Sequence, residues 1–144
     1  STVPVSSSAT VTVAKVEEQK EELKLIEDIK YITDKLKTVQ SLGDVVIYTE
    51  DTDPNKLLGR PHQYTGKLNF SDTRYKETKA SDFATIEIFQ NEQDLEDRYN
   101  YVETVTKSTP FLMYQFKHKN LLLRIPHEMT PSQTKEYEAA LKQM

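Results

Sequence analysis

The sequence predicts an α+β domain with a mainly antiparallel sheet of about five strands and with helices packed on one face of that sheet. Two observations support this prediction. Short β-rich runs occur as a group of three and then a group of two, and helical patterns precede, separate and follow these groups. The expected order is therefore helix, three strands, helix, two strands, helix, or α-β-β-β-α-β-β-α.

The first helix is expected over residues 15–40. Its apolar residues follow heptad spacing for barely two heptads; they are Leu25, Ile29, Ile32, Leu36 and Val39. Such a short stripe favours packing on the domain's own sheet over an independent coiled coil. Residues 1–14 show no helical period and are expected to form a flexible Ser/Thr-rich tether. The single domain would then cover residues 15–144, with a core from 42 to 144.

Three strands are expected after this helix. Gly43 is suited to the left-handed position that ends a helix, and Val45 to Tyr48 form a β-rich run just beyond it. Gly66 to Phe70 is the second candidate, with Leu68 and Phe70 on one face. Thr85 to Phe89 alternates most clearly, so that Ile86 and Ile88 face one side and Glu87 faces the other.

The second half of the chain has well-marked helix starts. Asn91 is expected to cap a helix that ends near Thr109-Pro110. A hairpin follows, with one strand around Tyr114 and Phe116 and the other at residues 121–125. Thr130, Pro131 and Gln133 then form the start of the last helix, in which Thr130 caps, Pro131 takes the first helical position and Gln133 completes a capping box.

Composition excludes several classes of function. The chain has 144 residues and a net charge of −4, and lysines and acids interleave in residues 15–37. This pattern is typical of a solvated helix face and argues against nucleic acid as a partner. There are no cysteines, which excludes disulfides and thiolate chemistry. No apolar run is long enough to span a bilayer, and the start at Ser1 leaves a removed targeting segment possible.

The segment Glu50 to Tyr64, EDTDPNKLLGRPHQY, is the candidate binding loop, because turn-forming and polar residues are dense there between two strand-like runs. Arg60, held between Gly59 and Pro61, could bind a carboxylate or phosphate, with Tyr64 as apolar support. Alternatively, Arg60 pairs with Asp53 or Glu50 and fixes the loop's shape. The candidate binding residues are Asp51, Asp53, Asn55, Arg60, His62, Gln63 and Tyr64.

No catalytic or metal motif accompanies the loop. Asp51, Asp53 and Asn55 have the first spacings of a calcium loop, but Lys56 and His62 replace the required glycine and glutamate. An Asx-type turn at Asp53 is the preferred interpretation. The three histidines show no zinc-ligand spacing, and no nucleophile elbow or glycine-rich phosphate loop is present. We therefore expect no catalytic residues, no metal and no cofactor.

Four segments resemble a family of small, uncharacterised secreted lipoproteins of Gram-positive bacteria. They are YTEDTDPNKLLGRPHQYTGKLNFSDTR (48–74), ATIEIFQNEQDLEDRYNYVETV (84–105), and NLLLRI with TPSQTKEYEAAL (120–125 and 130–141). The DPN-K-LLGRP-x-QYT string is the most specific part. The resemblance implies a lipidated N-terminus, a Ser/Thr-rich spacer and an extracellular, membrane-anchored location. It implies no assigned activity.

The expected function is that of an extracytoplasmic, monomeric cell-surface domain that binds a protein or a small anionic ligand, without chemistry of its own. Its only membrane contact would be a removed N-terminal lipid anchor. One alternative is an interaction lipoprotein that acts through helix 15–40, for example in phage exclusion or immunity. A second is a small hydrolase that uses His62 with Asp51 or Asp53.

Overall fold

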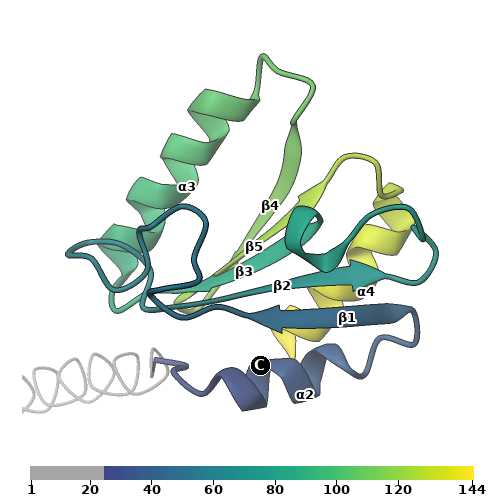
Figure 1. The fold of residues 1–144 in the computed structure, drawn as a ribbon, viewed down its shortest axis with the longest axis horizontal. Helices are drawn as coiled ribbons and strands as arrows, with labels where there is room; N and C mark the ends of the chain where they lie inside the picture. The colour runs from purple at the N-terminus through teal and green to yellow at the C-terminus, as the bar shows by residue number, and fades with distance from the viewer. Residues whose placement is uncertain (1–24) are drawn as a thin grey trace, which may run out of the picture.

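The computed structural model describes residues 25–144, which form a five-stranded antiparallel sheet with three α-helices (Figure 1). The expected tether (1–14) and the first part of the expected helix (15–24) lie outside the described residues. The α+β class, the antiparallel sheet and the predicted element order are confirmed. The elements are α2 (Ile29–Leu36), β1 (Leu42–Ile47), β2 (Gly66–Asp72), β3 (Ala84–Ile88), α3 (Glu92–Thr106), β4 (Met113–His118), β5 (Leu121–Pro126) and α4 (Pro131–Lys142), with a short 3-10 turn at Ala80–Asp82.

Helix α2 is shorter than predicted. It begins after Asp28, whose carboxylate accepts hydrogen bonds from the backbone N–H groups of Lys30 and Tyr31. Ile32 and Leu36 are buried, and the helix contacts α4 and β2. The apolar stripe of α2 therefore packs on the domain's own core, as the sequence indicated.

The sheet has the order β1-β2-β3-β5-β4, so β5 is an interior strand and β1 and β4 are the edges. The prediction that Gly43 ends a helix in a left-handed conformation is wrong, because Gly43 lies within β1. A Cβ atom on Gly43 would lie 2.4 Å from the hydroxyl oxygen of Ser71. Glycine at this position therefore permits close approach of β1 to β2.

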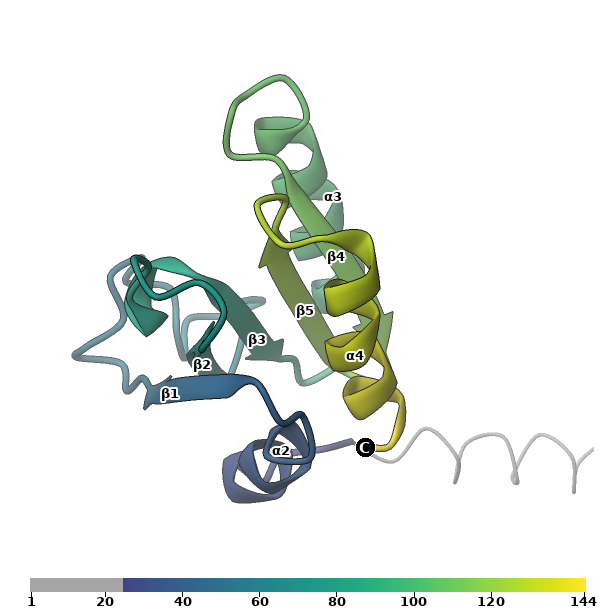
Figure 2. The ribbon, with the colours of Figure 1, turned by 90° about the vertical axis from the view of Figure 1, so that its right-hand side faces the viewer.

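Helices cover both faces of the sheet, so the prediction that they pack on one face is wrong (Figure 2). Leu121 and Leu123 of β5 belong to the large core beneath α2 and α4. Leu122, which points the opposite way, packs with Leu95 of α3 in a smaller cluster that also includes Tyr64. This second layer between α3 and the sheet is where the loop 50–64 joins the domain.

The predicted starts of the last two helices are confirmed. The Asn91 side chain accepts a hydrogen bond from the Asp94 N–H at the start of α3. Thr130 accepts one from the Gln133 N–H at the start of α4. The capping box is incomplete, however, because the Gln133 side-chain oxygen accepts a hydrogen bond from the Tyr75 hydroxyl.

Asp72, at the end of β2, fastens the sheet to α4. Its buried carboxylate accepts a hydrogen bond from the Tyr137 hydroxyl at 2.6 Å and two from the guanidinium of Arg74. Burial opposes the charged form of Asp72, but Arg74 and Tyr137 outweigh it and lower its pKa. The carboxylate is therefore held ionised inside the fold.

Asn120, in the turn between β4 and β5, holds the segment that precedes α2. Its side-chain oxygen accepts a hydrogen bond from the Ile26 N–H at 2.8 Å, and its amide group donates to the carbonyls of Ile26 and Phe89 at 2.7 and 2.9 Å. One buried side chain thus joins the start of the described chain to the ends of β3 and β5.

Candidate functional site

The loop 50–64 is built around the carboxylate of Asp53, which is fully buried. One oxygen accepts hydrogen bonds from the backbone N–H groups of Leu57 and Leu58, both at 3.0 Å. The other accepts one from the Asn55 N–H at 3.1 Å, which confirms the predicted Asx-type turn. Three backbone donors within five residues therefore close the chain tightly around a single side chain.

Two side chains complete this anchor. The Lys67 ammonium of β2 lies 3.1 Å from one Asp53 oxygen, and the Tyr64 hydroxyl donates to the other at 2.6 Å. Burial alone would raise the pKa of Asp53, but the hydrogen bonds from the Tyr64 hydroxyl and from the three backbone N–H groups lower it well below its usual range. Burial and the bond to Asp53 raise the pKa of Tyr64. The prediction that Asp53 and Tyr64 belong to an exposed recognition surface is therefore wrong, since both lock the loop from inside.

The backbone of the loop contains left-handed positions at Lys56, Gly59 and His62. Gly59 has a φ of 83°, and a Cβ atom there would lie 2.2 Å from a carboxylate oxygen of Glu50. The positive φ favours glycine at this point, whereas the flexible end of the Glu50 side chain could move away from a Cβ atom.

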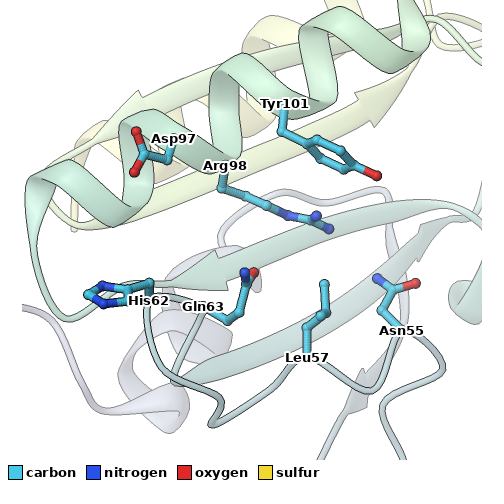
Figure 3. A pocket seen from close by; sticks show the side chains of 7 residues that line it. All are labelled: Asn55, Leu57, His62, Gln63, Asp97, Arg98 and Tyr101. Atoms are coloured by element: carbon cyan, nitrogen blue, oxygen red, sulfur yellow. The ribbon is translucent and has the colours of Figure 1, made fainter.

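A cleft of about 580 Å³ lies between this loop and helix α3 (Figure 3). Its size falls within the range of small-molecule sites. The loop contributes one wall and α3 the other. The lining residues are Asn55, Leu57, His62, Gln63, Asp97, Arg98 and Tyr101.

Arg98 lies at the centre of the cleft and points between Tyr101 and Leu57 (Figure 3). Its guanidinium contacts the buried Glu87 carboxylate, with nitrogen–oxygen distances of 3.2 and 3.4 Å. The same guanidinium lies 5.6 Å from the ring centre of Tyr64 and 5.7 Å from that of Tyr101. A carboxylate and two aromatic rings therefore fix its orientation.

Glu87 also bonds to Arg124 of β5, so two arginines share one carboxylate. Burial opposes the ionised form of Glu87, but Arg124 and Arg98 together outweigh it and lower its pKa. The three groups thus carry one net positive charge. Within residues 25–144, neither arginine has a second carboxylate within 4.0 Å.

The structure brings together three of the predicted site residues. Asn55, His62 and Gln63 line the cleft. Asp51 and Arg60 are exposed on the loop but do not line it. In the described part of the chain, Arg60 makes no ion pair, so the alternative in which it pairs with Asp53 or Glu50 is not observed.

Sequence reasoning missed the wall that α3 provides, namely Asp97, Arg98 and Tyr101, together with Leu57 from the loop. The sequence contained one sign of this wall, namely the spacing of two tyrosines in α3. Tyr99 and Tyr101 cannot share one buried face of a helix, and Tyr101 is indeed 58% exposed.

The hydrolase alternative required His62 to pair with Asp51 or Asp53, and it does not pair with either. Its Nδ1 atom lies 3.2 Å from a carboxylate oxygen of Asp94, at the N-terminus of α3. This contact ties the loop to the helix at one end of the cleft. Among residues 25–144, no three His, Asp or Glu side chains are grouped as metal ligands would be.

Comparisons with known protein families, with curated proteins and with solved structures found no match for this chain. None of the helices between residues 25 and 144 is both long and apolar enough to cross a membrane.

Proposed function

We propose that this chain is an extracytoplasmic binding domain of a Gram-positive cell-surface lipoprotein and that it binds a small polar ligand in the cleft between the loop 50–64 and α3. The observation that supports binding is the cleft itself. It is walled by a loop fixed from inside by Asp53, and it places the guanidinium of Arg98 beside the half-buried Gln63 and the exposed Tyr101.

The rigidity of both walls favours binding at low entropic cost. Asp53 anchors the loop to β2 through Lys67, and Glu87 anchors Arg98 to the sheet. Side chains that are held in place before a ligand arrives lose little conformational freedom when it binds. A preformed cleft with a few fixed polar groups is the usual form of a small-molecule site.

A ligand titration of the full chain followed by NMR tests this proposal. The panel would contain neutral sugars, amino acids, N-acylated amino acids, short peptides and inorganic phosphate, each at millimolar concentration. We expect at least one class to shift the amide resonances of Gln63 and Tyr101 saturably. The binding affinity should fall at least tenfold in Gln63→Ala and in Tyr101→Ala, because each variant removes a side chain that lines the cleft.

Arg60→Ala is the matched control, because Arg60 is exposed on the same loop but does not line the cleft. We expect it to leave binding unchanged. If Arg60→Ala abolishes binding while Gln63→Ala and Tyr101→Ala do not, the exposed turn is the site and the cleft is not. If no member of the panel shifts any cleft resonance, the proposal of a small-ligand site fails.

The proposed location is supported only by the resemblance of residues 48–74, 84–105, 120–125 and 130–141 to secreted lipoproteins. Expression of the complete gene in a Gram-positive host, with labelled palmitate in the medium, would test it. Label on the protein, together with cleavage by protease added to whole cells, is the expected result. An unlabelled protein in the cytosolic fraction would contradict it.

A further inference from the structure

We infer that the cleft binds a peptide-like monocarboxylate, with Arg98 as the group that binds the carboxylate and with Gln63 and Asn55 as partners for an adjacent amide. This inference depends on the proposed function of the same cleft and specifies its ligand class.

Arg98 has donors to spare. Two of its nitrogens, Nε and Nη2, donate to Glu87. A guanidinium carries five N–H donors in a fixed fork, so the remaining donors are free to meet a ligand. Because Arg98 lines the cleft and its orientation is fixed by Glu87, Tyr64 and Tyr101, these donors have a defined direction.

The charge beneath the cleft favours an anion. Arg98 and Arg124 share the single carboxylate of Glu87, which leaves one uncompensated positive charge in a largely buried cluster. A charge of this kind is screened less than one at the surface, so it attracts a ligand anion more strongly. A single carboxylate would neutralise it.

The other charged group of the cleft limits the ligand to one negative charge. Asp97 lies at the end of the cleft near His62, and its carboxylate points away from the Arg98 guanidinium (Figure 3). It accepts a hydrogen bond from the Gln93 side chain at 2.8 Å. A ligand with a second anionic group towards this end would meet Asp97, and repulsion between like charges would weaken its binding.

The remaining lining groups suit an amide and a compact apolar body. Gln63 and Asn55 each present a carboxamide, which offers both a donor and an acceptor, as the peptide group does. Leu57 and the ring of Tyr101 supply apolar surface on the two walls. This set of groups matches an N-acylated amino acid or the free carboxyl end of a short peptide.

Four probes test the inference on the full chain by calorimetry and NMR. N-acetyl-leucine carries the carboxylate, the amide and an apolar body. N-acetyl-leucinamide lacks the charge, 4-methylpentanoate lacks the amide group, and inorganic phosphate is an anion with neither an amide nor an apolar part. We expect N-acetyl-leucine to bind at least about tenfold tighter than each of the other three, because each lacks at least one recognised group.

Variants connect the preference to particular side chains. In Arg98→Gln, the advantage of N-acetyl-leucine over N-acetyl-leucinamide should disappear. In Gln63→Ala, its advantage over 4-methylpentanoate should shrink at least threefold. Gln63 is half-buried and makes no structural ion pair, so Gln63→Ala should fold. The inference can therefore still be tested with this variant if Arg98→Gln does not fold. Arg60→Ala should preserve both preferences.

The outcomes separate this inference from the proposed function. If N-acetyl-leucinamide or a neutral sugar binds the cleft as tightly as N-acetyl-leucine, the cleft is a ligand site but the carboxylate inference is wrong. If phosphate binds as tightly, only charge is recognised and the peptide-like class is wrong. If nothing in either panel binds the cleft, both proposals fail.

Discussion

Asp53→Ala should be among the most damaging single substitutions in this domain. It would leave the Lys67 ammonium, whose side chain is 4% exposed, without a carboxylate, and it would remove the acceptor of three backbone N–H groups and the Tyr64 hydroxyl. Removal of one partner of a buried ion pair typically costs about 3–5 kcal/mol. Domains of this size are stable by only about 5–15 kcal/mol, so a large fraction would be lost.

Urea denaturation followed by circular dichroism would measure the free energy of unfolding of the natural chain and of Asp53→Ala. Asp51→Ala is the matched control, because Asp51 is an exposed acid two residues away, and its removal should change stability by no more than about 0.5 kcal/mol. Adding Lys67→Met to Asp53→Ala should recover part of the loss, since it removes the unpaired charge. A loss below about 1 kcal/mol for Asp53→Ala would refute the claim that this carboxylate anchors the loop.

Three further predictions concern acid stability, helix capping and the N-terminal region. The carboxyl groups of Asp53, Asp72 and Glu87 have pKa values below their usual range in the folded state. The stability that they provide is therefore complete above about pH 5 and declines as the pH falls through 4 and lower. Urea midpoints from pH 7 to pH 2 should follow this decline, and a flat profile would contradict it. Asn91→Ala should cost about 1 kcal/mol in the same assay, because it removes the cap of α3, whereas an unchanged midpoint would mean that the cap contributes nothing. Deletion of residues 1–40 should lower stability more than deletion of 1–24, since only the longer deletion removes the buried Ile32 and Leu36, and equal midpoints would mean that α2 is not part of the core.

The order of the elements could be predicted because its signals are local. Asn91 and Thr130 cap helices with their own side chains, and Ile86 and Ile88 alternate with polar neighbours within a single strand. Which face of the sheet a helix covers is not local. The apolar stripe of α3 shows that the helix has a buried side, but it does not indicate against which layer. Leu122, apolar between two leucines, was the available sign that β5 is covered on both faces.

The site was predictable only in part, for the same reason. The dense turn residues correctly indicated a shaped loop, and Asn55, His62 and Gln63 do line the cleft. Whether Asp53 faces solvent or the interior depends on Lys67, which lies on the next strand. Arg98 comes from a helix that the fold brings against the loop, and nothing in the spacing of the sequence connects the two.

If the domain is anchored at its N-terminal end, as proposed, the hydrogen bonds between Asn120 and Ile26 have a mechanical consequence. Tension that arrives along the chain reaches Ile26 before it reaches α2, and Asn120 passes it directly to the turn between β4 and β5 and to the end of β3. Helix α2 is thereby bypassed, and the pull reaches the interior strands β3 and β5 together with the edge strand β4.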